Sequence, residues 1–533
     1  MSLTSILCRG AWCVTGILML GAANAGPPAA PQVTAGAGEV KQLRFDWNYV
    51  PQANYYELWF KANDGATEVK VDDYPSWRPR ATSNVSLHLL NWSQTRYRVK
   101  ACNPSGCTAT APIPVPLALR DAVGFLKSPY AFPYAAFGLI TKLSEDGNTL
   151  AAIDFPEEPA YPGEGPGPVA YLFKRNGSDW QLEARLVSGP LDPYRGSGVS
   201  ISLSGDGNRF AILQPEEIRT NDPAGGTIRV YQRTQGQWQL DAIIAPPGEA
   251  VVEGGTLSND GNVIDVRAVT SANLREHVYT RTTAGWTRTA SFPLAGTLRP
   301  DNQCWRSTVS GNGQVYARVC VLDGTYAVEV FAAPTWARRD RIDLVALPQG
   351  HMPITAELSD DGNVFSVSIV AAYDAVTTQP RVDVYERTGG SYMRAAALSQ
   401  GAWHQQASVH IPTQFGNRAH SLSSDGKILV IGDADDDGLG TGVLAPPLQP
   451  GGAALGAVYV YDRRATGWKL RNVIKYNRAP PESQRGALGS AVSLARAGKM
   501  LAVADITDST LAPNPHSPLP IVSGNDSGAI WFY

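Results

Sequence analysis

Short apolar runs alternate with polar turns from residue 118 to residue 533, and one turn is repeated along the chain. Its clearest copy reads Leu-Ser-Glu-Asp-Gly-Asn, and its glycine returns at intervals of 49 to 72 residues. Aspartate followed by glycine between apolar runs is typical of a β-hairpin, because glycine adopts positive φ without steric cost. The sequence therefore predicts seven similar hairpins. The copies lie at 143–148, 203–208, 257–262, 309–313, 358–363, 422–427 and 494–499, the last keeping only its glycine.

Each repeat has two further apolar runs after its hairpin. The third reads Val-Ala-Tyr-Leu-Phe at 169–173, and the fourth begins at an aromatic residue such as Trp180, which we expect to pack between blades. Four up-and-down strands in each of seven repeats predict an all-β fold with a seven-bladed β-propeller at 118–533. The last repeat ends in its third run, at 528–533. We predict that a strand near 120–127 completes that blade and closes the ring.

Residues 30–117 form a separate unit without the repeat. It opens at Pro31, alternates apolar and polar residues at 43–47 and 55–60, and continues with Tyr-x-Val-x-Ala-x-Asn-x-x-Gly at 97–106. These features resemble a fibronectin type III domain. The resemblance implies a seven-stranded β-sandwich that acts as a spacer or recognition module and not as a catalyst.

The repeats can also be compared with a known family. Phe-Gly at 415–416, the Asp-Gly turn, Gly-Ala-Val-Tyr-Val-Tyr at 456–461 and Gly-x-Trp as at 236–238 resemble the FG-GAP repeats of the integrin alpha-chain propeller. Repeats three to five lack the Phe-Gly pair. Bacterial propellers with Ser-Pro-Asp-Gly-Lys turns share the hairpin but not the tyrosine-rich strand. The integrin resemblance implies a binding or cell-adhesion protein.

Composition and the first residues indicate an exported protein. The formal net charge is −3 and 17% of the residues are charged, which argues against a nucleic-acid-binding protein. Arg9, an apolar run at 11–20 and Ala-Asn-Ala at 23–25 predict a cleavable signal peptide at 1–25. No later stretch approaches the roughly 20 apolar residues of a transmembrane helix. We expect a secreted, extracellular or periplasmic monomer.

Export places the remaining four cysteines in an oxidising compartment. Cys102 and Cys107 flank a tight turn, and Cys304 and Cys320 are equidistant from Asn312 at the centre of the fourth repeat turn. An antiparallel hairpin would place the second pair face to face. Zinc ligation by four thiolates usually needs closely spaced Cys-x-x-Cys pairs. We therefore predict the disulfides Cys102–Cys107 and Cys304–Cys320.

Calcium is the one cofactor that the sequence raises. In most copies each repeat turn carries a single carboxylate, whereas calcium takes six to eight oxygens, so we interpret the repeated aspartate as a turn former. Asp433, Asp435 and Asp437, followed by Gly438, match the first half of a calcium loop. The later ligand positions of known loops have no carboxylate here. A calcium site and a solvated acidic loop both remain open.

Function is less well defined than fold. The sequence contains no His-Glu-x-x-His, Gly-x-Ser-x-Gly or phosphate-binding loop, and we assign no catalytic residue. A binding or adhesion protein that recognises an extracellular protein or glycan is favoured over an extracellular enzyme acting on polysaccharide or glycoconjugate. Three long loops between second and third strands, at 155–168, 432–455 and 505–527, form the predicted recognition surface. The N-terminal domain is expected to enter from the opposite face and leave these loops free.

Overall fold

The structure is a computed structural model. It describes residues 26–129, 135–154, 169–187, 200–214, 227–245, 251–269, 274–293, 303–322, 324–344, 347, 351–371, 380–400, 415–417, 419–449, 455–477, 486–495, 497–509 and 527–533. The predicted signal peptide at 1–25 and the predicted loop at 155–168 lie outside these residues, as do 450–454 and 510–526 of the other two loops.

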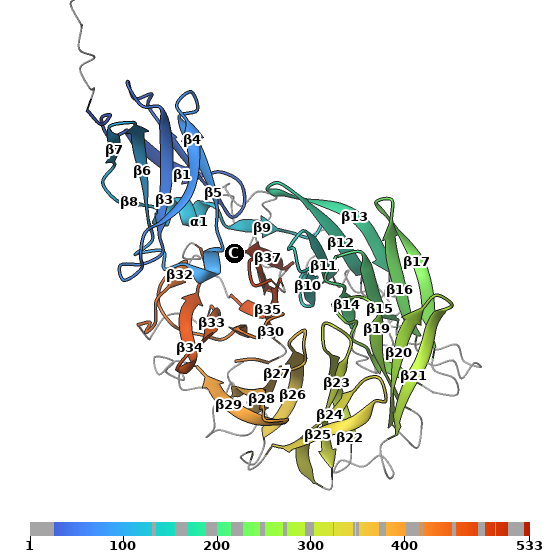
Figure 1. Cartoon of the computed structure of the whole chain (residues 1–533). Helices are drawn as coiled ribbons and strands as arrows, with labels where there is room; N and C mark the ends of the chain where they lie inside the picture. The colour runs from blue at the N-terminus through green and yellow to red at the C-terminus, as the bar shows by residue number, and fades with distance from the viewer. Residues whose placement is uncertain are drawn as a thin grey trace, which may run out of the picture.

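The N-terminal unit consists of two antiparallel sheets packed face to face (Figure 1). Apolar side chains alternate with polar ones along the strands, so one face of each sheet is buried, and Phe45 and Tyr97 pack across the core with ring centroids 4.7 Å apart. The unit is thus a β-sandwich. One sheet contains β1 (Val33–Ala37), β2 (Gln42–Trp47) and β5 (Arg80–Asn84); the other contains β4 (Val69–Pro75), β3 (Tyr55–Lys61), β6 (Arg96–Asn103), β7 (Gly106–Ala109) and β8 (Ile113–Pro114).

Seven further antiparallel sheets follow one another around a ring (Figure 1). In five of them the strands are hydrogen-bonded in chain order, which is the up-and-down order of a propeller blade. The sixth has an additional short strand, β32, and the seventh is completed by β9. The predicted seven-bladed propeller is therefore the observed architecture.

Each blade has at least four strands. Blades 1 to 3 contain β10 (Thr141–Leu143), β11 (Thr149–Asp154), β12 (Val169–Asn176), β13 (Asp179–Val187); β14 (Ile201–Leu203), β15 (Arg209–Gln214), β16 (Thr227–Thr234), β17 (Gln237–Ile244); β18 (Val251–Gly254), β19 (Val263–Val269), β20 (Leu274–Thr282) and β21 (Gly285–Pro293). Blades 4 and 5 contain β22 (Gln303–Val309), β23 (Val315–Leu322), β24 (Thr325–Ala332), β25 (Ala337–Asp343); β26 (His351–Leu358), β27 (Val364–Ala371), β28 (Arg381–Thr388) and β29 (Ser391–Ser399). Blades 6 and 7 contain β30 (His420–Leu422), β31 (Ile428–Asp433), β32 (Val443–Leu444), β33 (Ala457–Arg464), β34 (Gly467–Ile474); β35 (Leu488–Leu494), β36 (Leu501–Asp505), β37 (Ala529–Phe532) and β9 (Gly124–Leu126).

The ring closes as the sequence predicts. Gly124, Phe125 and Leu126 pair with Phe532, Trp531 and Ile530 in an antiparallel ladder, so β9 is the fourth strand of blade 7. The closing strand is shorter than predicted, because helix α1 (Pro116–Asp121) occupies the start of the 120–127 segment. Proline at the first helical position favours that helix.

The repeat turns have one conformation throughout the ring. In the first copy, Ser144 Oγ donates to Asp146 Oδ1 (2.6 Å), and the same Oδ1 accepts the backbone N–H of Asn148 (2.9 Å). Burial opposes ionisation of Asp146, but these hydrogen bonds outweigh it and hold the pKa of the carboxyl below its usual value. The interpretation of the repeated aspartate as a turn former is confirmed. Equivalent serine-to-side-chain hydrogen bonds occur at 204–206, 258–260, 310–312, 359–361 and 423–425.

Each turn also packs on the turn of the preceding blade. Gly207 has a φ of 66°, and a Cβ placed there would lie 2.4 Å from Thr149 Oγ1 in blade 1. Glycine is therefore required twice, by the backbone conformation and by the close approach. We call the face of the propeller that carries these turns, together with the hairpin turns between third and fourth strands, the short-turn face.

The aromatic residues of the fourth strands pack between blades as expected. Trp238 in blade 2 donates its indole N–H to Glu183 in blade 1 (3.1 Å), and Trp468 in blade 6 donates to Glu386 in blade 5 (2.9 Å). Trp180 in blade 1 stacks on Phe532 in blade 7, with ring centroids 4.7 Å apart. These rings therefore join neighbouring blades.

Both predicted disulfides are present. Cys102 and Cys107 join β6 to β7 with Cα atoms 4.1 Å apart, and Cys304 and Cys320 join β22 to β23 with Cα atoms 3.9 Å apart. Two disulfides fit the predicted extracellular or periplasmic location. None of the helices described by the structure has the length and apolar character needed to cross a membrane.

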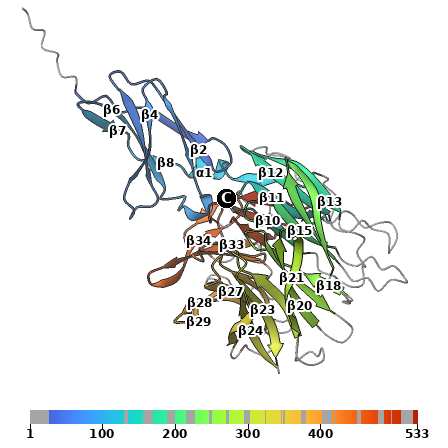
Figure 2. The same ribbon diagram turned by 45° about the vertical axis from the view of Figure 1, so that its right-hand side comes forward.

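The sandwich packs on the rim of blades 6 and 7 (Figures 1 and 2). His88, in the 3-10 helix η1 (Leu87–Leu89), is fully buried, and its ring nitrogens lie 3.2 and 3.1 Å from the carbonyl oxygens of Tyr533 and Gly498. On β34, Asn472 donates its side-chain amide to the carbonyl of His88 (2.8 Å). Because Gly498 belongs to the repeat turn of blade 7, the sandwich reaches the short-turn face, as expected.

The expectation that the sandwich leaves the long loops free is wrong for blade 6. A Cβ placed at Gly442, in the predicted loop 432–455, would lie 2.7 Å from the ring of Trp92 in the sandwich. Val443 and Leu448 in this loop are buried, and β32 pairs with β34. Burial of these apolar side chains stabilises the loop against the blade and the sandwich. Residues 432–449 are therefore part of a packed interface.

Candidate functional site

The propeller has a central channel, and three side chains meet across its axis on the short-turn face. Asn259 Nδ2 lies 3.1 Å from Glu145 Oε2 and 3.1 Å from Asp360 Oδ2. These residues follow the serines of the turns in blades 1, 3 and 5. Residues from alternate blades can come into contact only across the centre of the ring, so the three side chains close the channel at this end.

Backbone contacts fix this floor of the channel. The backbone N–H of Glu145 donates to the carbonyl of Gly205 (2.7 Å), and that of Gly205 donates to the carbonyl of Asn259 (2.7 Å). A Cβ at Gly205 would lie 2.0 Å from Asn259 Oδ1, and one at Gly311 would lie 1.8 Å from Asp360 Oδ1. Two glycines thus make room for the polar side chains of the neighbouring blades. Sequence analysis did not find this floor, because it treated the residue after the serine of each turn as variable.

A charged pair lies inside the channel, further from the short turns. Lys142 on β10 and Glu357 on β26 approach to 4.0 Å, and their side chains are 42% and 26% exposed. Both side chains are thus partly accessible to solvent above the floor of the channel. Glu357 Oε2 also accepts the backbone N–H of Leu422 (2.8 Å), which fixes the carboxylate against blade 6. An acidic and a basic side chain therefore lie close to the axis of the propeller.

One histidine lies beside this pair. His420 Nδ1 is 3.0 Å from Thr355 Oγ1, and Thr355 Oγ1 is 2.8 Å from Ser368 Oγ. Burial lowers the pKa of His420 below its usual value, although Glu357 opposes this shift, so the ring is neutral at neutral pH. The imidazole is 4% exposed. Its position is that of a core residue that ties blade 6 to blade 5, and not that of a catalytic group in contact with substrate.

Second strands end in buried aspartates at the opposite face of blades 1, 6 and 7. Asp154, Asp433 and Asp505 occupy equivalent positions in the ladders and are 1% exposed or less. Each accepts a hydrogen bond from a residue just after the fourth strand of the preceding blade. The donors are Ser128, Gln400 and Tyr476. The aspartates therefore join successive blades, and burial raises the pKa of Asp505 to about 6, with Asp508 acting in the same direction.

Two lysines neutralise further aspartates in blades 6 and 7. Lys475 Nζ lies 2.8 Å from Asp436 Oδ1, and Lys127 Nζ lies 2.8 Å from Asp508 Oδ1. All four side chains are at most 7% exposed. The two pairs are equivalent, since each lysine follows a fourth strand and each aspartate comes three residues after the end of a second strand. The sequence signal for this pairing was a lysine directly after each of the two fourth strands, Lys475 and Lys127.

The proposed calcium ligands have different roles. Asp433 accepts hydrogen bonds from Gln400 and from the backbone N–H of Asp435, and the central carboxylate of the segment is Asp436. Among the described residues, the one group of three metal-ligating side chains within 4.8 Å of one another is Glu57, Cys102 and Cys107, and its cysteines are disulfide-bonded. Asp433, Asp435 and Asp437 are not brought together in that way. Calcium binding there stays a prediction.

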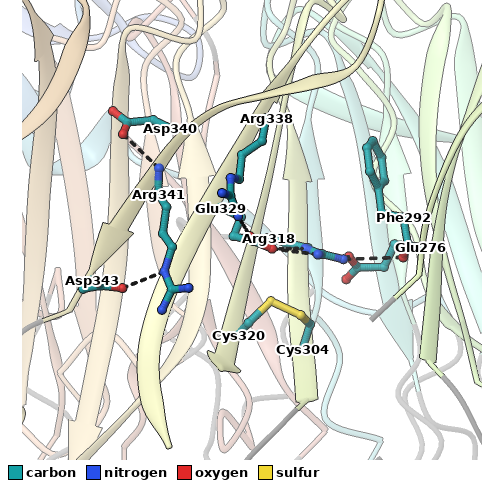
Figure 3. Close-up of polar contacts among 10 residues, drawn as sticks. All are labelled: Glu276, Phe292, Cys304, Arg318, Cys320, Glu329, Arg338, Asp340, Arg341 and Asp343. Carbon is teal, nitrogen blue, oxygen red and sulfur yellow. Dashed lines mark hydrogen bonds and ion pairs between the residues drawn. A yellow bond between two sulfur atoms is a disulfide. The ribbon is translucent and has the colours of Figure 1, made fainter. Parts of the chain in front are cut away.

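A different buried ionic cluster joins blades 3 and 4 (Figure 3). Arg318 lies between two carboxylates, with Nη1 3.1 Å from Glu276 Oε2 and Nη2 2.7 Å from Glu329 Oε2. Arg338 contacts the other oxygen of Glu329 at 2.9 Å. Burial alone would lower the pKa of Arg318, but Glu276 and the other acids raise it instead. With its charges compensated internally, the cluster has a structural role.

A small cavity lies further out, between blades 4 and 5. It has a volume of about 320 Å³ and contains the ion pair of Arg381 with Asp383, in which Nε lies 2.9 Å from Oδ1. Arg394 approaches the same carboxylate at 3.7 Å. The paired charges leave this cavity with little net charge, and we assign it no ligand.

The comparisons with known proteins place the chain in no family. No family model and no curated protein matches it. Solved structures similar to it include the periplasmic gluconolactonase of Pseudomonas aeruginosa, at 12% identity over 79% of this chain and 95% of the other, with a TM-score of 0.39. A putative 6-phosphogluconolactonase from Bacteroides uniformis is 13% identical over 79% and 97%, with a TM-score of 0.39. TolB from Acinetobacter baumannii is 11% identical over 72% and 76%, with a TM-score of 0.33. At these scores the likeness carries no argument about function, which rests on the residues of the channel and the loops.

Proposed function

We propose that the protein is an exported binding protein whose ligand, an extracellular protein or glycan, is recognised at the long-loop face of the propeller. One observation carries this proposal: Glu145, Asn259 and Asp360 close the channel at the short-turn face. A ligand that uses the channel must therefore enter from the opposite face. The predicted loops of blades 1 and 7 begin on that face, after Asp154 and Asp505.

The finer family assignments belong to the same proposal. Phe415 is fully buried and Gly416 has a φ of 70°, and the backbone N–H of Gly416 donates to the carbonyl of Gly432 (2.8 Å). A buried aromatic followed by a glycine at a tight turn is the role expected of the Phe-Gly pair in FG-GAP repeats. The two-sheet sandwich supports a fibronectin type III-like domain. We infer that it acts as a spacer, because it is fixed to blades 6 and 7.

A binding screen with loop variants tests the proposal. The probes are a glycan array and a panel of extracellular proteins, each with and without calcium. In the test variant, residues 511–525 are replaced by a short Gly-Ser linker, which leaves Asp508 and Ser527 in place. We expect it to lose the ligand that the wild type binds. Deletion of 436–452 is unsuitable as a test, because it would leave Lys475 without Asp436.

The matched control lies on the other face. Arg464→Gln changes an exposed residue in the third-to-fourth-strand turn of blade 6, where Arg464 pairs with Asp462 at 2.8 Å. We expect this variant to bind normally. Loss of binding in Arg464→Gln with retention in the loop variant would place recognition on the short-turn face and overturn the proposal.

An extracellular enzyme is the second candidate, and the pair of Lys142 and Glu357 near the axis of the propeller is the observation that favours it. A partly exposed acid–base pair could support hydrolysis of a polysaccharide or a glycoconjugate. Turnover that is lost in Glu357→Gln, while the fold is kept, would favour this candidate over binding alone.

A further inference from the structure

Three cationic side chains from three different elements meet where the sandwich joins the propeller. Lys41 lies in the turn between β1 and β2, Arg175 lies at the end of β12 in blade 1, and Lys499 lies in the short turn of blade 7. Lys41 Nζ donates to the carbonyl of Lys499, and Arg175 Nη2 donates to the carbonyl of Val40 (2.9 Å). The turn of the sandwich is thus held between the turns of two blades.

Lys41 has an unusual backbone conformation. Its φ is 61°, in the left-handed region, where residues other than glycine, asparagine and aspartate are uncommon. The turn is fixed there because the backbone N–H of Lys41 donates to the carbonyl of Ala122 (2.8 Å) and its own carbonyl accepts the N–H of Val85 (2.8 Å). Glycine or asparagine would take this conformation at lower cost. A lysine at such a position suggests that its ammonium group has a role.

Lys41 Nζ and the guanidinium of Arg175 donate hydrogen bonds to carbonyl oxygens. In the part of the chain that the structure describes, none of Lys41, Arg175 and Lys499 forms an ion pair within 4.0 Å. Burial, together with the positive charges of Arg175 and Lys499, lowers the pKa of Lys41 to about 7. Glu39 is the carboxylate that favours the charged form of Arg175. The three cations thus oppose one another, and a bound anion would relieve that repulsion.

We propose that the junction between the sandwich and blades 7 and 1 binds a tetrahedral oxyanion, the phosphate or sulfate ester of a larger ligand, through Lys41, Arg175 and Lys499. The ammonium of Lys41 has three N–H groups and uses one on the carbonyl of Lys499. Arg175 uses Nε on Gly177 (2.9 Å) and Nη2 on Val40, which leaves Nη1 to donate. Free donors of Lys41 and Arg175 therefore border the same turn of the sandwich, and charge-assisted hydrogen bonds to phosphate or sulfate oxygens are strong.

This site is separate from the proposed function of the long-loop face. Gly177 and Lys499 belong to turns on the short-turn face, on the other side of the channel floor. An anion bound there would contact the sandwich and two blades at once. It would therefore favour the docked arrangement of the two domains and raise the stability of the whole chain by mass action.

Calorimetry and thermal unfolding of the full chain at constant ionic strength test the proposal. The probes are inorganic phosphate, inorganic sulfate, dextran sulfate and neutral dextran. The test variants are Lys41→Asn, which keeps a residue that tolerates positive φ, and Lys499→Gln. Each removes one charged contact, so we expect affinity to fall by about tenfold or more in each. The control is Lys427→Gln, which changes the equivalent position in the turn of blade 6, where Lys427 is paired with Asp425 at 3.2 Å.

The results separate the two sources of the anion. Tighter binding of dextran sulfate than of either inorganic ion identifies a sulfated polysaccharide, and phosphate bound more tightly than both sulfates identifies a phosphate ester. The reverse-charge variant Lys499→Glu should abolish binding and keep the fold, because Lys499 is an exposed turn residue. Absence of binding by every anion, or an equal loss in Lys427→Gln and Lys499→Gln, overturns the proposal.

Discussion

Blades 6, 7 and 1 and blades 3 and 4 are built from the same repeat but are held together by different interactions. In blades 6, 7 and 1, buried aspartates at the ends of the second strands accept hydrogen bonds from the linkers between blades. In blades 3 and 4, Arg318 pairs with two carboxylates, and a disulfide joins Cys304 to Cys320 (Figure 3). The first arrangement joins successive blades through single hydrogen bonds. The second stabilises blades whose sequences lack the Phe-Gly pair.

The difference shows which parts of a repeat are replaceable. All seven blades keep the glycine of the repeat turn, with φ between 65° and 71°. The contacts at the opposite face vary, because a fixed turn already sets the register of each hairpin. Packing at that face can then use either hydrogen bonds to single aspartates or a cluster of charges. Variants in each region can show how much the stability of its blades depends on these contacts.

The largest effect is expected in blade 4. Arg318→Met should destabilise the protein by about 3–5 kcal/mol, because Glu276 would be left as an uncompensated buried charge. Glu329 would keep Arg338, at 2.9 Å. Denaturant unfolding followed by tryptophan fluorescence measures the loss. The double variant Arg318→Met/Glu276→Gln should recover much of it, and a double variant as unstable as the single one would contradict this account.

Lys475→Met tests the equivalent dependence in blade 6. Lys475 and Asp436 are 3% and 0% exposed, and Asp436 keeps hydrogen bonds from Tyr459 and from the N–H of Gly438 (2.9 Å). We expect a loss of about 3 kcal/mol at pH 7, at the lower end for a broken buried pair. The loss should shrink at pH 5, where the carboxyl of Asp436 can accept a proton. Lys469→Met on the same strand is exposed and should cost much less, and an equal loss there would refute the role of the pair.

The stability of the protein should depend on pH through the buried aspartate Asp505 in a way that an exposed aspartate would not cause. The folded pKa of Asp505 is about 6, raised by burial and by Asp508, against 3.8 for the free residue. Its contribution to stability is therefore fully present below about pH 4 and is lost as the pH rises through 6. Asp505→Asn should flatten the stability curve between pH 4 and 7, a change of up to about 3 kcal/mol. Unfolding measured across this range checks it, with Asp64→Asn, at an exposed turn of the sandwich, as the control that keeps the wild-type slope.

Much of the fold could be predicted from the sequence, because the turn that repeats is a local structure. Serine, aspartate and glycine in the repeat turn make their contacts within five residues of one another, as Ser144, Asp146 and Thr149 do. Ring closure was also predictable, because the last repeat ends in its third apolar run and a segment near 120–127 can supply the fourth strand. The disulfide between Cys304 and Cys320 followed from hairpin symmetry about Asn312.

The candidate sites depend on contacts that no local pattern records. The channel floor brings together Glu145, Asn259 and Asp360 from three different blades. Glu145 and Asn259, for example, are 114 residues apart in the sequence. The acidic segment at 433–437 suggested a metal site because its counter-ion, Lys475, is 39 residues from Asp436. The cations of the junction come from two domains. Charge compensation of this kind is visible only once the chain is folded.

The smallest effect is expected at a single repeat turn, and it shows what the two regions share. Asn312 replaces aspartate in blade 4, and its Oδ1 accepts hydrogen bonds from Ser310 Oγ (2.8 Å) and the N–H of Gln314 (3.0 Å), as Asp206 accepts them from Ser204 and Asn208 in blade 2. Asp206→Asn should therefore be nearly neutral at pH 7.

Removal of the acceptor should cost more than its replacement. Asp206→Ala should destabilise the protein by about 1 kcal/mol, the net value of the lost hydrogen bonds at a half-exposed turn. Hydrogen bonds from Ser204 and Asn208 outweigh burial and hold the pKa of Asp206 below its usual value, so the contribution of its charge is present above about pH 4 and is lost as the pH falls through the folded pKa. Asn312→Ala should cost a similar amount with no such dependence on pH. Denaturant unfolding of the three variants at pH 7 and pH 3 measures both effects, and a large loss in Asp206→Asn would show that the turn requires the charge and not merely the oxygen.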